Sequence, residues 1–535
     1  MTSQLMADDA PTPDLAATQP LRRRLLPDWL AIAAVLGLFP VVHDVRGMLI
    51  APYSLDEAWV AMSVRFPVTD LMAVTSSTPA GWTLLLRLAP DADYLRLVPL
   101  AFHLLSVVAA YLFARALSWR TAALARIAGL GCAGAVLLLP AQQIRHDLKQ
   151  YTADAAITLA LLALAAWTEG GWSRRRLGIL VALVPVGMAV SHVTAIVALC
   201  VFGGLTLTAL AVKRWRRLAE SAVAGLAAAA SIVAVYLAVS ARGNNGSLKD
   251  FWAANMPSLS ALPGYLSRQV DALTPAMGAP APLLLALLAC GVATIAVHGR
   301  PAAATAVVLL PLAATTLGVA KAYPLLELRT SHFLLVAIAA VAGIGLAGAA
   351  TAAADLARRW HPRVPHTAVA ATISGALVAA FAASNISWYR FDGEDPRIPI
   401  RTMTALEDVR SAASYVESHR AARDVILVSG RGRYGFVFYW DQCPVRRVPH
   451  GNAVGWHVVL PTQPDIIFAG EDEPGIRRGL QRALDLSASR GPGARVWLIR
   501  SHVTGAEPAA WQAVLADYEV DIVTGGREPV ALLTP

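Results

Sequence analysis

The sequence predicts a polytopic α-helical membrane protein with about eleven transmembrane helices, followed by a C-terminal extracytoplasmic α/β domain. Three observations lead to this class. Of the 535 residues, 56% are hydrophobic and only 15% are charged, and the mean hydropathy is +0.53. Apolar runs of bilayer-spanning length recur as far as about residue 390. Short basic clusters occur in every second connection between these runs and so fall on one side of the membrane, as the positive-inside rule expects.

Residues 1–27 are predicted to form a disordered cytoplasmic tail, because the first 20 residues are polar and rich in Pro and Ala. Arg22, Arg23 and Arg24 then precede the first apolar run and hold the N-terminus inside. That run has no small-residue cleavage site at its end, so we expect an uncleaved span rather than a signal peptide.

A multi-pass domain of the plasma (inner) membrane is predicted over residues 28–390. The candidate spans are the apolar runs 29–50, 97–115, 122–141, 151–168, 177–191, 193–212, 220–241, 282–298, 302–320, 332–353 and 366–386. The outer side then receives the long first loop, 51–96, several shorter connections and the C-terminal domain. Prolines divide the first loop into short apolar stretches, which we expect to lie as amphipathic helices along the interface.

The C-terminal domain is predicted over residues 391–535. Short β-rich apolar runs alternate there with helical stretches, which is typical of a small α/β domain with a largely parallel sheet. Strands are expected at 424–430, 465–469, 495–500, 520–523 and 530–533, and helices at 407–418, 474–487 and 508–517.

The net charge of +9 does not indicate nucleic-acid binding, because the basic residues follow the membrane topology. Cys132, Cys200 and Cys290 lie in apolar runs, and Cys443 is alone in the C-terminal region. This distribution predicts neither a disulfide framework nor a zinc site.

The adjacent carboxylates Asp56 and Glu57 follow the first span at the membrane surface. Ionised groups so close to hydrocarbon need water or a partner, so this pair is the first candidate for chemistry. The alternative is an ordinary helix start, since acidic residues favour a first turn.

Further polar groups are expected on the same outer side. They are Arg145, Asp147, Lys149 and Tyr151 at the start of the fourth span, His192 between the fifth and sixth, and Tyr323 and Arg329 after the ninth. In a helix Asp147 and Tyr151 would share a face. Basic groups beside paired carboxylates suit a reaction on a lipid-linked phosphate. The other interpretations are headgroup contacts, an interfacial histidine and a snorkelling arginine.

These motifs resemble those of the GT-C superfamily of integral-membrane glycosyltransferases, close to the protein-mannosyltransferase, aminoarabinose-transferase and RgtA-D-like group. The resemblance covers roughly residues 28–390. Asp56-Glu57 matches the acidic pair, and Asp147-Leu-Lys149-Gln-Tyr151 matches Glu-x-Lys/Arg-x-Tyr with Asp in place of Glu. His192 precedes small residues, and Tyr323-Pro324 precedes Arg329. Many relatives have glycines where this chain has Glu327, which we expect to alter the local phosphate site.

The resemblance implies a sugar donor on a polyprenyl monophosphate, an envelope acceptor (glycan, lipid or protein) and inversion in a single step. Asp56 would be the general base, and Glu57 would orient the acceptor or a basic neighbour. Lys149 and Arg329, with Arg145, would neutralise the phosphate. Asp147, Tyr151, Tyr323 and His192 would complete the donor site. No cofactor or metal is required on this interpretation, with a divalent cation on Asp56 as the alternative.

Two rival functions stay open from the sequence. A lipid-linked sugar transporter or flippase would need ionisable residues in mid-span or broken helices in matching halves. A non-catalytic membrane scaffold would bind a partner or glycan through its C-terminal domain. The aromatic run 434–440 suits that role if it is exposed, but it is at least as typical of a buried strand.

Overall fold

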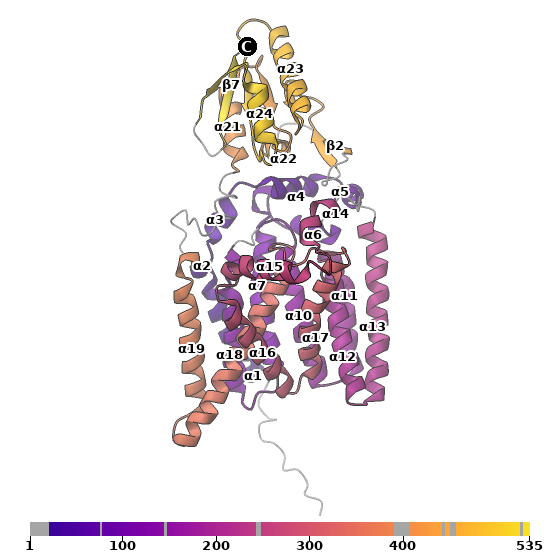
Figure 1. Cartoon of the computed structure of the whole chain (residues 1–535), viewed down its shortest axis with the longest axis vertical. Helices are drawn as coiled ribbons and strands as arrows, with labels where there is room; N and C mark the ends of the chain where they lie inside the picture. The colour runs from indigo at the N-terminus through magenta and orange to yellow at the C-terminus, as the bar shows by residue number, and fades with distance from the viewer. Residues whose placement is uncertain are drawn as a thin grey trace, which may run out of the picture.

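The computed structural model describes residues 21–74, 78–143, 147–241, 248–389, 407–440, 445–449, 456–524 and 528–534. A bundle of helices carries a small α/β domain on one end, and a layer of short helices lies between the two (Figure 1). The predicted class, a polytopic helical protein with a C-terminal α/β domain, is confirmed. Residues 1–20 of the predicted tail 1–27 lie outside the described residues. The first helix begins at Leu21, so the last seven residues of the predicted tail belong to it.

The bundle is built from helices whose apolar residues face both the protein core and the surface, as in a membrane domain. They are α1 (Leu21–Gly37), α2 (Phe39–Val42), α3 (Val45–Ile50), α7 (Leu97–Arg115), α8 (Ala122–Leu137), α9 (Pro140–Gln143), α10 (Tyr151–Gly170), α11 (Arg174–Val190), α12 (Thr194–Ala211), α13 (Trp215–Val235), α15 (Leu262–Met277), α16 (Ala281–Val297), α17 (Pro301–Val319), α18 (His332–Trp360) and α19 (His366–Ser384). Helices α10 and α18 lie at the centre and are mostly buried.

Every apolar run predicted to span the membrane falls on one or more of these helices. Among the described residues, seven helices are long and apolar enough to cross a bilayer, or up to eight if the bent pair α15–α16 counts as one span. The first run is broken into α1, α2 and α3. A polytopic membrane domain is therefore confirmed, whereas the number of eleven spans stays a prediction.

The first long connection folds into short helices on the end of the bundle that carries the α/β domain (Figure 1). These are α4 (Leu55–Arg65), α5 (Leu71–Val74) and α6 (Ala80–Leu86), with 3-10 turns at Val68–Asp70 and Ala92–Tyr94; a later connection adds α14 (Leu248–Phe251) and a 3-10 turn at Ala253–Asn255. The helices expected in this loop are present, and α4 carries Asp56.

The C-terminal domain has a five-stranded sheet in the order β4-β1-β5-β7-β6. Its elements are α21 (Val409–His419), β1 (Val425–Val428), α22 (Arg433–Tyr439), β2 (Arg446–Pro449), β3 (Trp456–Val459), β4 (Ile466–Phe468), α23 (Glu473–Ser489), β5 (Val496–Ile499), α24 (Glu507–Leu515), β6 (Glu519–Ile522) and β7 (Val530–Thr534). Strands β4, β1 and β5 pair in parallel, but β7 pairs antiparallel with both β5 and β6. The sheet is thus mixed rather than largely parallel.

Two further features of this domain differ from the sequence-based expectations. Strands β2 and β3 form a separate antiparallel pair that was not predicted. The aromatic run 434–440 is neither exposed nor a strand, because most of it forms the buried helix α22. Phe436 and Trp440 stack one helical turn apart, with ring centroids separated by 4.8 Å. The run therefore contributes to the core, where a partner or glycan could not reach it.

The α/β domain and the first loop share one hydrophobic core. The indole of Trp456 stacks on Trp59 of α4 at 5.8 Å and donates a hydrogen bond to the carbonyl oxygen of Val74 at 3.1 Å. The backbone N–H of Tyr53 donates to the hydroxyl of Tyr439 at 2.7 Å. The segment that carries Asp56 is therefore fixed on one side by the bundle and on the other by the C-terminal domain.

Candidate functional site

Asp56 lies in the first turn of α4. The helix begins at Leu55, directly after its N-cap residue Ser54. Ser54 and Glu57 form a reciprocal capping box, which satisfies the first free N–H groups of the helix. The backbone N–H of Leu55 is bound by Glu407 of the C-terminal domain at 2.7 Å. With the backbone held in this way, the carboxylate of Asp56 projects from the helix and is 44% exposed.

Two cations from distant segments meet on one oxygen of Asp56. Lys149 Nζ and Arg329 Nη1 each lie 3.0 Å from Asp56 Oδ2. Lys149 precedes α10, and Arg329 lies in the connection before α18, so three parts of the chain converge here. Lys149 is 13% exposed and Arg329 is 32% exposed, so both cations face a partly open site.

The two cations set the protonation state of Asp56. Burial alone would raise the pKa of this carboxyl group, but Lys149 and Arg329 outweigh it and lower the pKa to about 2. In turn, burial would lower the pKa of Lys149, but Asp56 outweighs it and raises that pKa. At neutral pH the cluster is therefore an ionised carboxylate between two full positive charges.

Glu327 fixes the orientation of Arg329. Its carboxylate accepts hydrogen bonds from Arg329 Nε at 3.2 Å and from the backbone N–H of Arg329 at 3.1 Å. It also accepts from the N–H of Thr330 at 2.8 Å. The guanidinium carbon of Arg329 lies 5.3 Å from the ring centre of Trp252, a cation–π distance. Glu327 thus holds the guanidinium so that its far edge points at Asp56.

The two predicted tyrosines lie close to this cluster. The Tyr323 hydroxyl donates to the carbonyl oxygen of Thr330 at 2.7 Å and closes the loop that carries Arg329. Burial raises the pKa of Tyr323 well above its usual value, so the phenol stays neutral. Tyr151 is the first residue of α10 and is close enough to Lys149, Arg329 and Asp56 to interact electrostatically with all three.

Other predicted site residues have different positions. Asp147 precedes α10 and accepts the backbone N–H of Lys149 at 3.3 Å, so it shapes the turn and does not share a helix face with Tyr151. His192 lies in the connection between α11 and α12, where burial lowers its pKa to about 4. Arg145 lies outside the described residues.

Glu57 is turned away from Asp56 into the protein. It is fully buried and makes a bidentate ion pair with Arg96, with both N–O distances at 2.7 Å. Arg96 also donates to the carbonyl oxygens of Met48, Ala51 and Pro52. Every strong polar group of this pair is therefore satisfied, and the pair ties both ends of the first loop to the chain preceding α4.

This ion pair leads to a stability prediction. Replacing Arg96 by Met would leave the Glu57 carboxylate buried without its partner, so we expect a loss of about 3–5 kcal/mol in unfolding free energy. Thermal unfolding of the purified protein in detergent would measure it. Arg120→Met is the matched control, because Arg120 is 69% exposed in its ion pair with Asp355, and an exposed pair contributes about 0–1 kcal/mol. Equal losses of stability in the two variants would contradict a stabilising role of the buried Glu57–Arg96 ion pair.

No protein-family model and no curated protein matches this sequence. Among solved structures, the chain is similar to ArnT from Cupriavidus metallidurans in the apo state, with a TM-score of 0.53 and 14% identity over 95% of this chain and 98% of that chain. ArnT bound to undecaprenyl phosphate matches with a TM-score of 0.52 and the same coverage. The chain therefore shares the overall fold of ArnT. At this identity the likeness concerns the fold, and the reaction has to be argued from the site.

The oligosaccharyltransferase of Archaeoglobus fulgidus is a more distant match, with a TM-score of 0.47 and 11% identity. This chain covers 69% of its length. The fold expected from the family resemblance is confirmed by the ArnT comparison, which spans nearly the whole of both chains.

No metal centre is evident in the described part of the GT-C fold. Among those residues no group of three or more His, Cys, Asp or Glu side chains lies close enough together to hold an ion. The alternative from the sequence is a divalent cation bound to Asp56. In the structure the Asp56 carboxylate forms ion pairs with Lys149 and Arg329 instead. Catalysis without a metal remains a prediction.

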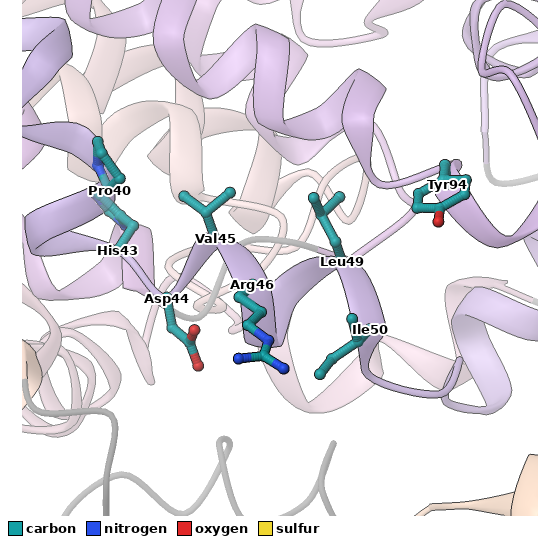
Figure 2. A pocket seen from close by; sticks show the side chains of 8 residues that line it. All are labelled: Pro40, His43, Asp44, Val45, Arg46, Leu49, Ile50 and Tyr94. Atoms are coloured by element: carbon teal, nitrogen blue, oxygen red, sulfur yellow. The ribbon is translucent and has the colours of Figure 1, made fainter.

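An open pocket lies at the edge of the GT-C bundle beside α2 and α3 (Figure 2). Its lining is mainly apolar, and it also includes Arg46 of α3 and Asp44, which caps α3 by accepting the backbone N–H of Gly47 (Figure 2). Neither Asp56 nor either of its two cationic partners lines it. This pocket is therefore distinct from the Asp56 cluster, and we assign it no part in the chemistry.

Several residues of the site carry no motif and were not predicted. Tertiary contacts that no local sequence pattern predicts bring three such residues to the site, namely Arg96, Trp252 and Glu407. Asp154 is different, because it is an acidic residue inside an apolar span, and such residues are functional candidates by default. The sequence therefore carried a signal for Asp154, although the predicted site did not include it.

Proposed function

We propose that this protein is a glycosyltransferase that moves a sugar from a polyprenyl-phosphate donor to an acceptor hydroxyl at the extracytoplasmic face of the plasma (inner) membrane. The observation that carries the proposal is the convergence of Lys149 and Arg329 on the half-exposed carboxylate of Asp56. Two fixed cations at the membrane surface form a phosphate site, and a carboxylate beside them can accept a proton.

The likeness to ArnT supports the lipid-linked donor. One of the two matching ArnT structures is bound to undecaprenyl phosphate, and the match extends over 95% of this chain. The orientation is supported by the α12–α13 and α18–α19 connections, which lie at the end of the bundle away from the α/β domain (Figure 1). Arg216 is in the first turn of α13 and Arg358 in the last turn of α18, as positive-inside orientation expects. The N-terminus would then be cytoplasmic, and the C-terminal domain would face the acceptor.

The resting cluster implies an exchange of partners. With a pKa of about 2, Asp56 in its ion pairs is too weak a base to take a proton from a hydroxyl group. A donor phosphate that binds Lys149 and Arg329 would displace Asp56 from them and raise its pKa. Binding of the donor would thus activate the base, and Glu327 and Trp252 would keep Arg329 in place during the exchange.

The transfer step then balances in charge. The acceptor oxygen attacks the anomeric carbon, its proton passes to Asp56, and the bond from that carbon to the phosphate oxygen breaks. The electron pair leaves with the phosphate, which gains one negative charge as Asp56 loses one. Lys149 and Arg329 stabilise the charge that develops on the leaving oxygen. Attack opposite the leaving group inverts the anomeric configuration.

The partner exchange leads to a prediction on pH. Because the base must be ionised, activity falls as pH falls through the pKa of Asp56. In the free enzyme that pKa is about 2, and in the donor complex it would rise toward the ordinary value of about 3.9. We therefore expect the acid limb of kcat to lie at higher pH than that of kcat/KM, with both flat from about pH 5 to 8. An acid limb near pH 7 would assign the base to another group.

The direct test is sugar transfer by the purified protein in sealed proteoliposomes. It would use radiolabelled polyprenyl-phosphate sugars with a cell-envelope extract as acceptor. Transfer by the wild type would establish the activity. Movement of the labelled lipid across the bilayer without transfer would favour a flippase, and donor binding without either result would favour a scaffold.

A further inference from the structure

A group of polar side chains lies buried at the end of the bundle nearest to Asp56. Asp154 is in the first turn of α10 and is 2% exposed, and Ser191 and Thr194 are fully buried. Ser191 lies beside the Asp154 carboxylate, in the α11–α12 connection. Thr194 begins α12 and packs near Ile157, one helical turn after Asp154. The first turn of α10 and the chain around the α11–α12 connection thus bring a carboxylate and two hydroxyls together.

These groups are not satisfied by the protein. Within the described residues, Asp154 Oδ1 and the side-chain oxygens of Ser191 and Thr194 have no hydrogen-bond partner. The Ser191 hydroxyl is close enough to the Asp154 carboxylate to interact with it, while Asp154 Oδ1 is left without a partner. Buried polar atoms are almost always paired, and an unpaired carboxylate oxygen is among the costliest exceptions. Such a site is suited to a ligand that brings hydrogen-bond donors.

The group is continuous with the Asp56 cluster. Tyr323 is close enough to interact electrostatically with Asp154, Tyr151 and Glu327. Tyr151 in turn interacts with Lys149, Arg329 and Asp56. Asp154 follows Lys149 by five positions, in the first turn of the helix that Lys149 precedes, so a substituent of a phosphate held by Lys149 would reach this region. Of the two substituents on a polyprenyl-phosphate sugar, the sugar carries the donors that a carboxylate can bind.

We propose that Asp154, together with Ser191 and Thr194, binds the sugar of the lipid-linked donor. This inference rests on the proposed function and specifies its substrate class. A carboxylate accepts hydrogen bonds from hydroxyl or ammonium groups, whereas it repels another carboxylate. The donor sugar is therefore a neutral or amino sugar and not a uronic acid.

The test compares the binding of lipids with and without a sugar. Purified wild type, Asp154→Asn and Ser191→Ala would be titrated with undecaprenyl phosphate and with undecaprenyl phosphate carrying a neutral hexose, an amino sugar or a uronic acid. Asp70→Asn is the matched control, because Asp70 is a carboxylate of the first loop on the same side. Thermal unfolding of each variant would check that it folds.

We expect the wild type to bind a neutral or amino sugar lipid more tightly than bare undecaprenyl phosphate. Asp154→Asn should weaken that binding by about 10- to 100-fold, as the loss of a hydrogen bond to a charged group does. Ser191→Ala should weaken it by less. Neither variant should change the binding of bare undecaprenyl phosphate, and the uronic acid lipid should bind no better than the bare lipid.

The outcomes separate this inference from the proposed function. Equal weakening of bare and sugar-bearing lipids in a folded Asp154→Asn or Ser191→Ala protein would make the group structural and overturn the inference. No gain from any sugar in the wild type would also overturn it, as would tight binding of the uronic acid lipid. Failure of the wild type to bind undecaprenyl phosphate at all would overturn the proposed function itself.

Discussion

Replacing Asp56 by Asn should lower sugar transfer by about 10³- to 10⁴-fold, at the upper end of what a general base contributes. Asn keeps the shape of the side chain but cannot accept the acceptor's proton. The same substitution should tighten the binding of bare polyprenyl phosphate by about 10-fold, because Lys149 and Arg329 would no longer be engaged by a competing carboxylate. Single-turnover transfer and lipid binding on one preparation would measure both.

The opposite signs of these two effects make the result specific. A substitution that merely damaged the fold would weaken binding and transfer together. Asp70→Asn serves as the control, since Asp70 lies in the same loop and its described side-chain contact is a weak one with Thr69. Transfer by Asp56→Asn at the wild-type rate would remove Asp56 as base, and unchanged lipid binding would remove the partner exchange.

Removal of either cation should give the second large effect. We expect Lys149→Met and Arg329→Met each to lower transfer by about 10²- to 10³-fold, the range found when one group that stabilises developing charge is deleted. Lys149 should matter more for donor binding, because Glu327 already compensates part of the charge of Arg329. Steady-state kinetics and lipid titration would measure kcat, KM and affinity for each variant.

The design of this experiment allows a matched control and a conservative variant. Lys321→Met removes an exposed lysine from the same connection as Arg329 and should leave transfer within about twofold. Arg329→Lys keeps the charge but loses the fork that Glu327 orients, so it should restore only part of the activity. Full activity of Lys149→Met would contradict the assignment of Lys149 to the phosphate.

The sequence predicted the helical class and the segments of the site because both leave strong local signals. Long apolar runs identify the bundle, and basic residues on the outer side break the charge rule. Lys149 and Arg329 are two such exceptions, and the structure brings both to Asp56. Lys149 and Arg329 are far apart in the chain, so only the family resemblance could suggest that both would bind the same carboxylate.

Local sequence could not assign the separate roles of Asp56 and Glu57. Adjacent residues in a helix point about 100° apart, so two neighbouring carboxylates at a helix start cannot both face one ligand. Which of the two turns inward depends on Arg96, which is distant in sequence and buried. Because the capping box also uses Glu57, the exposed carboxylate is Asp56.

In the C-terminal domain, local sequence patterns predicted only part of the secondary structure and sheet topology. Its parallel strands follow from short apolar runs, but the antiparallel pairing of β7 depends on how the last segment returns to the sheet. The helix α22 has strong β-formers such as Tyr434, Phe436 and Phe438, yet it is helical because both its faces are buried against α4 and α21. Tertiary packing decided these elements against local propensity.

A structure of the protein with undecaprenyl phosphate bound would test the central claim most directly. The account predicts the phosphate within hydrogen-bonding distance of Lys149 Nζ and of the Arg329 guanidinium, with the Asp56 carboxylate released from at least one of them. It also predicts that Glu327 keeps its contact with Arg329 Nε. A phosphate bound elsewhere, with both 3.0 Å ion pairs of Asp56 intact, would contradict it.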